Sequence, residues 1–134
     1  ERIVIGWRHD FWETVFRLAR GFDQDEALYR SIQDRRRATM QLLITELALQ
    51  AHRLERGHHP ERLDSLVPDF LDTLPIDPFA GQPLRYRLMG EGQYLLYSVG
   101  PDEADDGGQR ATYREMIHGQ GDFFLDAVVD LMDR

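Results

Sequence analysis

The fold is decided by one stretch of sequence, Ala38-Thr-Met-Gln-Leu-Leu-Ile-Thr-Glu-Leu-Ala-Leu-Gln-Ala-His-Arg-Leu-Glu-Arg-Gly57. Apolar residues recur in it at intervals of three and four, which is the spacing of one face of an α-helix. The pattern begins near Asp25 and stops before Gly57. Glycine is the usual residue just past the end of a helix. We therefore expect a long helix from about 25 to 56, with residues 38–56 packed on a sheet. The residues expected to face that sheet are Leu43, Leu47, Ala51 and Leu54.

Upstream of this helix the sequence predicts a separate, shorter one. Asp10 followed by Glu13 has the form of a capping box, and apolar residues continue at helical spacing as far as Gly21. We expect a short helix over about 11–20, whose aromatic residues belong either to the core or to a docking patch. The apolar face of the long helix breaks at residues 35–37, three arginines that are either solvated or form a docking surface for acidic groups. The chain is accordingly divided into an N-terminal helical extension, 1–37, and a domain, 38–134.

Downstream, prolines and alternating residues predict short elements. Pro60 suits the first turn of a small helix that carries Leu63 and Leu66. Two alternating runs, 84–88 and 94–99, are separated by a glycine-containing connection and predict an antiparallel hairpin. Residues 122–126 are expected to add a third strand, with a helix beyond it. The fold class is therefore α+β: a long helix packed on a small antiparallel sheet, with an extra short helix before it.

Composition excludes several classes of function. The chain has 134 residues, with 16 basic and 24 acidic side chains and a net charge of −8, and every basic residue is Arg. This charge argues against a nucleic-acid partner. The absence of cysteine excludes disulfides, thiolate metal sites and cysteine nucleophiles. No stretch reaches the roughly 18 to 20 apolar residues that a membrane span needs, so membrane attachment is expected only through a segment absent from this chain.

Several motifs follow one another in an order that is similar to a known family. The helix end at His58-His-Pro60 is followed by Leu74-Pro-Ile-Asp-Pro-Phe-Ala-Gly-Gln-Pro-Leu-Arg-Tyr86 and by Tyr97-Ser-Val-Gly-Pro-Asp102. Over residues 38–126 the chain resembles the globular domain of the type II secretion major pseudopilin, also called pseudopilin G, without the prepilin N-terminal helix. The resemblance implies a non-enzymatic assembly or interaction domain of the general secretion pathway or cell envelope. It also implies a periplasmic or extracytoplasmic location, other envelope or secretion proteins as partners, and a membrane anchor in the full-length protein. The first residue is Glu1 rather than methionine, so we expect a processed or excised protein.

The resemblance further implies a calcium site in the loop after the second strand. The family binds calcium there, and the matching positions are Asp102, Asp105, Asp106 and Asp122. Calcium takes about 6 to 8 oxygen ligands at flexible distances, which a glycine-rich acidic turn can supply. The alternatives are a solvated acidic turn, whose carboxylates bond nearby backbone amides, and a site for another metal.

Catalytic motifs are missing from the sequence. It contains no Gly-x-Ser-x-Gly elbow, no phosphate loop and no dinucleotide-binding glycine pattern. His58 and His59 precede a proline and suit a turn, with a weak metal or pH-sensitive element as the alternative. We therefore expect a protein that is not an enzyme. Two further hypotheses remain, a cell-envelope binding module without pilus-like assembly and a carboxylate-dependent hydrolase with two acids in a cleft.

Overall fold

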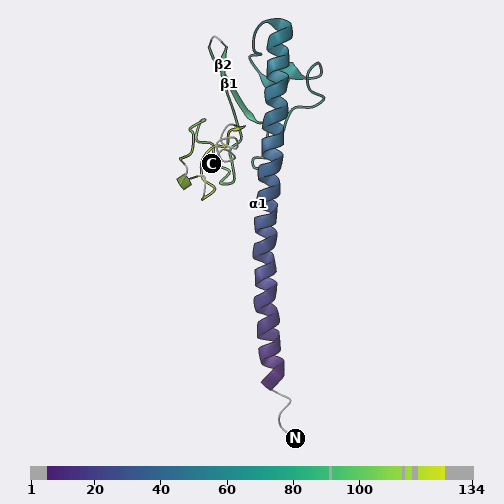
Figure 1. Ribbon diagram of the computed structural model, residues 1–134, viewed down its shortest axis with the longest axis vertical. Helices are drawn as coiled ribbons and strands as arrows, with labels where there is room; N and C mark the ends of the chain where they lie inside the picture. The colour runs from purple at the N-terminus through teal and green to yellow at the C-terminus, as the bar shows by residue number, and fades with distance from the viewer. Residues whose placement is uncertain (1–5, 91, 113, 116–117, 126–134) are drawn as a thin grey trace, which may run out of the picture. The chain divides into compact units, whose positions relative to one another are not determined.

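The computed structural model describes residues 6–90, 92–112, 114–115 and 118–125, with side chains from residue 26 onward. Its elements in chain order are the helix α1 (Gly6–Arg56), the 3₁₀ helix η1 (Leu63–Leu66) and the strands β1 (Arg85–Gly90) and β2 (Gln93–Tyr97) (Figure 1). The predicted α+β class is confirmed at this level. The chain divides into two compact units, Glu1–Gln33 and Asp34–Arg134.

The helix α1 is a single element of 51 residues. The prediction of a separate short helix over 11–20 that ends at Gly21 is therefore wrong. Glycine inside a helix costs only about 1 kcal/mol relative to alanine, and helix-forming neighbours on both sides outweigh that cost. The predicted end is confirmed, because Gly57 has φ +81° and its N–H donates to the Arg53 carbonyl at 2.8 Å.

One row of α1 side chains forms the helical part of the core. The row is fully or almost fully buried and repeats at intervals of four and three residues. Its members are Ala38, Leu42, Thr45, Leu49 and His52. Leu42 and Leu49 cluster with Leu63 and Leu66 of η1 and with Leu96 of β2. We call the five α1 residues Ala38, Leu42, Thr45, Leu49 and His52 the core row.

The core row is not the row that the sequence predicted to face the sheet. Leu43, Leu47 and Leu54 are 40%, 61% and 87% exposed, and Ala51 is exposed as well. The prediction misjudged the face because Thr45 and His52 made the true core row look polar. In the structure the Thr45 hydroxyl donates to the Gln41 carbonyl at 2.7 Å, so its burial leaves the hydroxyl proton bonded.

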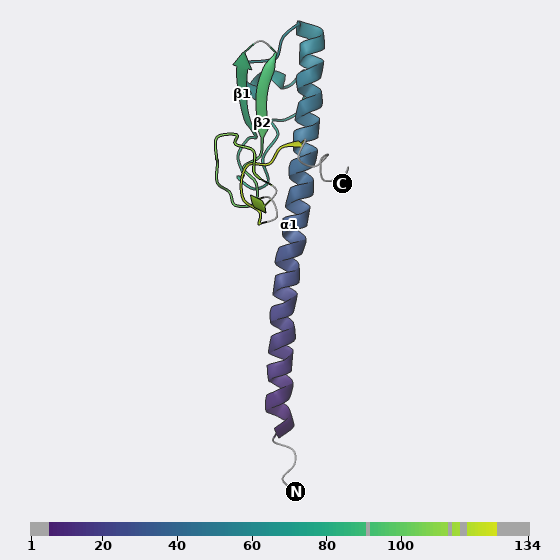
Figure 2. The ribbon, with the colours of Figure 1, turned by 60° about the vertical axis from the view of Figure 1, so that its left-hand side comes forward.

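The predicted hairpin is confirmed. Strands β1 and β2 pair antiparallel, with Arg85 opposite Tyr97 and Leu88 opposite Tyr94, and the register shifts between Leu88 and Gly90. In both ribbon views the hairpin lies beside the C-terminal part of α1 (Figures 1 and 2). Leu96 of β2 belongs to the core cluster and Tyr86 of β1 packs against it, so the hairpin presents one face to the core row.

The third strand over 122–126 is present only as a fragment. Ser98 and Phe123 form an isolated antiparallel bridge in which each backbone N–H donates to the other's carbonyl, at 3.0 and 2.8 Å. The chain forms no longer ladder within the described residues 118–125. The predicted C-terminal helix falls largely on residues 126–134, which lie outside the described part of the chain.

Candidate functional site

The acidic loop after β2 is held together by its own carboxylates. Asp102 accepts hydrogen bonds from the backbone N–H of Ala104 at 3.2 Å and of Gly121 at 2.8 Å. The first bond closes a local turn, and the second ties the loop to a segment 19 residues further along the chain. These two hydrogen bonds of Asp102 therefore stabilise the loop, although its side chain is exposed.

Asp105 is the most heavily bonded of the four predicted ligands. Its carboxylate accepts from the Tyr97 hydroxyl at 2.9 Å, the Gly107 N–H at 3.0 Å and the Arg85 Nε at 3.0 Å. These donors lower the pKa of Asp105, the Gly107 N–H most strongly. Burial and the adjacent Asp105 carboxylate raise the pKa of Tyr97 to about 12. The hydrogen bonds of Asp105 with Tyr97 of β2 and Arg85 of β1 thus hold the loop against the hairpin.

Asp122 is buried and turned toward the same loop. Its two oxygens accept the backbone N–H of Asp106 at 3.3 Å and of Gly108 at 2.7 Å. Burial raises the pKa of Asp122, and the nearby Asp105 and Asp106 carboxylates act in the same direction. The structure therefore brings Asp122 to the Asp105–Gly108 turn, where the hydrogen bond from Asp106 comes from its backbone N–H.

This geometry bears directly on the predicted cation site. Within the described residues, no group of three or more His, Asp or Glu side chains is arranged to hold a metal ion. Asp102, Asp105 and Asp122 act instead as acceptors for backbone N–H groups of the loop. Such bonds are those of an acidic turn, the alternative stated from the sequence. Calcium stays a prediction to be tested by titration.

Sequence reasoning missed the most deeply buried carboxylate, that of Asp77. This residue is 0% exposed, and its side chain accepts three hydrogen bonds. The donors are the Phe79 N–H at 3.0 Å, the Ser98 hydroxyl at 2.8 Å and the Val99 N–H at 2.9 Å. Asp77 therefore joins the proline-rich loop to the end of β2. The Asp77-Pro78 and Ser98-Val99 pairs were both noted in the sequence, but nothing there indicated that they meet.

Two histidines are packed at the C-terminal end of α1. His52 is buried, and its Nδ1 lies 2.8 Å from the carbonyl oxygen of His58. His59 is buried with its ring edge-on to Tyr94, at 4.6 Å between centroids. Burial lowers the pKa of His59, and the charge of Arg53 lowers it further. These contacts agree with the turn interpretation of the histidines.

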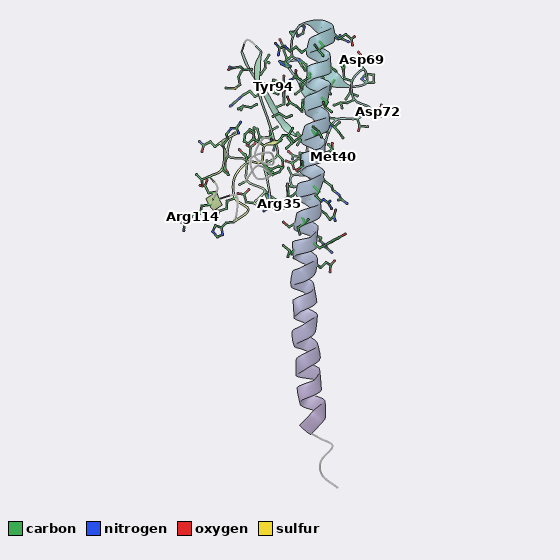
Figure 3. All side chains as sticks on the ribbon, viewed as in Figure 1. Arg35, Met40, Asp69, Asp72, Tyr94 and Arg114 are labelled. Atoms are coloured by element: carbon green, nitrogen blue, oxygen red, sulfur yellow. The ribbon has the colours of Figure 1, made fainter. Side chains whose placement is uncertain are left out.

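A shallow groove runs beside β2 in the same region. It encloses about 420 Å³, and the described residues that line it are Glu46, Tyr94, Leu95, Leu96, Arg110, Phe124 and Leu125. The Glu46 carboxylate accepts the Tyr94 hydroxyl in a short hydrogen bond and also bonds the Gln50 amide at 3.2 Å. The one acid on the groove wall in this described set is therefore used to join α1 to the hairpin. Figure 3 labels Tyr94 on the hairpin side of this contact.

The opposite side of α1 carries a second apolar row that is exposed. We call it the outer row. Its large members are Met40, Leu43, Ile44, Leu47 and Leu54, which are 56%, 40%, 42%, 61% and 87% exposed. Met40 is labelled on α1 in Figure 3. Single exposed apolar residues are common on proteins, but a contiguous row is typical of an interaction surface.

No protein-family model, curated protein or solved structure matches the chain. None of the helices in the described part of the chain combines the length and the apolar run needed to cross a bilayer.

Proposed function

We propose that this protein is a non-enzymatic, pseudopilin-like assembly or interaction domain of the cell envelope or secretion machinery, and that it docks through the outer row of α1. The observation that carries the proposal is the exposure of Met40, Leu43, Ile44, Leu47 and Leu54 along one side of a helix whose other side is already packed. The proposed family and the proposed location outside the cytoplasm are supported by the motif order over residues 38–126, which resembles that of pseudopilin G.

The energetics of the outer row support docking. Burying a leucine, isoleucine or methionine side chain stabilises an association by about 1.5–3 kcal/mol relative to leaving it in water. The outer-row side chains are 40–87% exposed, so each can gain only that fraction of this free energy on docking. Together they can form the apolar centre of a protein interface. Met40, Leu47 and Leu54 are more than half exposed in the single chain, so the domain leaves most of their apolar surface open to a partner.

The environments of the acids support a structural role rather than a catalytic one. A carboxylate hydrolase needs two acids whose environments differ and whose oxygens reach a substrate. Burial and neighbouring charges raise the pKa of Asp122, and hydrogen bonds lower that of Asp105. Both carboxylates, however, are turned onto N–H groups of their own loop. A calcium ion beside them would offset the cost of the buried charge, which is why calcium stabilisation belongs to the proposal.

The experiment uses the absence of cysteine from the chain. Leu47→Cys places one thiol on the outer row, and Asp72→Cys places one on an exposed loop as the matched control. Each full-length variant is made in its native cells and treated with a maleimide that does not cross the cytoplasmic membrane. We expect the control to label rapidly in intact cells. We expect the Leu47→Cys thiol to label at least about tenfold more slowly in cells than in dilute purified protein.

Two results would contradict the proposal. Equal labelling rates of the Leu47→Cys thiol in cells and in purified protein would show that nothing covers the outer row. If the Asp72→Cys control were labelled only after lysis, the domain would lie in the cytoplasm and the proposed envelope location would be wrong.

A further inference from the structure

We infer that His59 makes the contact between the C-terminal end of α1 and the hairpin sensitive to pH. When its ring takes up a proton, residues 58–60 leave their place between these elements while the rest of the domain stays folded. We call residues 58–60 the junction segment. The inference goes beyond the proposed function and does not depend on it, because it does not involve the outer row.

The junction segment contacts α1 and both strands of the hairpin. His59 is 5% exposed, and its ring is edge-on to Tyr94 of β2 with 4.6 Å between the centroids. The same ring makes a hydrogen bond with the backbone of Leu49 in α1. The carbonyl of the next residue, Pro60, accepts a hydrogen bond from the Tyr86 hydroxyl of β1 at 2.6 Å. The segment therefore joins the end of the helix to the hairpin.

One ring nitrogen of His59 has no hydrogen-bond partner. Its Nδ1 atom is buried, and no described residue lies within hydrogen-bonding distance of it. A neutral imidazole has one nitrogen without a proton, and Nδ1 can be that atom because the other nitrogen bonds Leu49. In the protonated ring both nitrogens are donors, so Nδ1 would hold a buried N–H without an acceptor, next to a buried charge. The site therefore fits only the neutral ring.

The groups around His59 do not offer the protonated ring a partner. Burial lowers the pKa of His59 most, and the charges of Arg53 and His52 on α1 lower it further. The Glu46 carboxylate acts in the opposite direction, but it already accepts the Tyr94 hydroxyl and bonds the Gln50 amide. The titratable and charged groups that surround the ring are Glu46, His52 and Arg53 of α1, Tyr86 and Tyr94 of the hairpin, and the neighbouring His58. The protonated ring gains an acceptor by turning out to water.

The release is local because the rest of the domain has contacts of its own. The leucines of the core row pack on η1 and on Leu96 of β2. Asp77 joins the proline-rich loop to Ser98 and Val99 without any contribution from the junction segment. We therefore expect the ring contact between His59 and Tyr94 to be lost in mild acid, while the hydrogen bonds of Asp77 persist.

The pH of the transition follows from the linkage between release and proton uptake. A histidine in water has a pKa of about 6.5, and only the released ring of His59 takes up the proton readily. Each tenfold preference for the closed form at neutral pH then lowers the midpoint by about one pH unit. A preference of about 10- to 100-fold would place the midpoint between about pH 5.5 and 4.5.

The test is an NMR titration of the purified chain from about pH 7.5 to pH 4.5. The ring signals of the histidines report protonation, and cross-peaks between the rings of His59 and Tyr94 report their contact. We expect His59 to titrate at a lower pH than the exposed His118. The cross-peaks to Tyr94 should disappear at the His59 midpoint, while the amide of Val99 stays protected from hydrogen exchange.

Two variants separate the proton on His59 from other effects of acid. His59→Phe keeps an aromatic ring that cannot take up a proton, so its contact with Tyr94 should persist to the lowest pH. His118→Gln removes an exposed histidine and is the matched control, which should leave the transition at His59 unchanged. The titration of the parent chain decides the inference even if His59→Phe does not fold.

Three outcomes would overturn the inference. A His59 ring that takes up its proton with the Tyr94 contact intact would show that the site accepts the charged ring. Loss of the contact at the same pH in His59→Phe would assign the transition to other groups. Loss of protection at Val99 with the same midpoint would show that the whole domain unfolds, so that no local release takes place.

Discussion

Replacing Asp77 by alanine should be among the most damaging substitutions in the domain. The side chain is fully buried and accepts the Phe79 N–H, the Ser98 hydroxyl and the Val99 N–H at 2.8–3.0 Å. A hydrogen bond to a charged group contributes about 1.5–3 kcal/mol, and each buried donor left without a partner costs about 1–3 kcal/mol. The three bonds share one carboxylate and are not additive. We therefore expect the free energy of unfolding to fall by about 3–5 kcal/mol.

The conservative variant separates the hydrogen bonds from the volume of the side chain. Asp77→Asn keeps the shape but retains a single acceptor oxygen, and its amide N–H₂ must face a backbone donor. We expect it to lose about 2–3 kcal/mol. Asp72→Ala, on an exposed loop, is the control and should change stability by less than about 0.5 kcal/mol.

Urea unfolding followed by far-ultraviolet circular dichroism measures all three variants, with the slope m checked for constancy. In a domain of about 100 residues, a loss of 3 kcal/mol lowers the melting temperature by roughly 12 °C or more. An Asp77→Ala protein within about 0.5 kcal/mol of the parent, at unchanged m, would refute the reasoning. It would mean that water replaces the carboxylate at no cost and that the loop does not depend on it.

Three further predictions concern the core, the loop and the helix junction. Leu49→Ala, at a fully buried position, should cost about 2–5 kcal/mol in urea unfolding, whereas Leu47→Ala should cost less than about 0.5 kcal/mol, and equal costs would contradict the assignment of the two rows. The melting temperature should rise in millimolar calcium much more than in magnesium, and Asp102→Ala should remove the response; identical curves in calcium and in chelator would exclude the site. Burial lowers the pKa of His59 in the folded protein. Below about pH 6.5 this histidine therefore takes up a proton in the unfolded chain but not yet in the folded protein. Stability should therefore decline from about pH 6.5 down to the lower folded pKa, and His59→Gln should flatten that part of a plot of urea midpoint against pH; an unaltered slope would show that other groups cause it.

Local structure followed from the sequence where a single residue or a short pattern decides it. Gly57 marked the end of α1, because a residue with positive φ carries little strain only when it is glycine. The alternating run before Gly90 marked the hairpin, and its pairing of Arg85 with Tyr97 lies within the predicted strands. By contrast, Gly21 did not end a helix, since a propensity of about 1 kcal/mol yields to helical neighbours on both sides.

The choice of the buried helix face could not be read from the sequence. Between residues 38 and 56 two apolar rows satisfy helical periodicity, and the outer row is the more hydrophobic of the two. Burial of Thr45 becomes acceptable only because its hydroxyl bonds the Gln41 carbonyl, and His52 only because its ring bonds the His58 carbonyl. Those partners, together with the leucines of η1, decide which row the domain covers.

What the sequence determined by itself about this protein is its α+β class, the end of α1, the hairpin and the acidic loop, because each follows from local spacing, turn chemistry and charge. The tertiary structure alone decided that Asp122 closes onto Gly108 across 14 residues, and that Asp77 binds Ser98 and Val99 across 21 and 22 residues. These contacts join carboxylates to donors distant in the chain, and such pairs leave no periodic trace in a single sequence. The tertiary structure also decided that the outer row is the exposed one, because a helix with two apolar rows buries the row against which the rest of the domain packs.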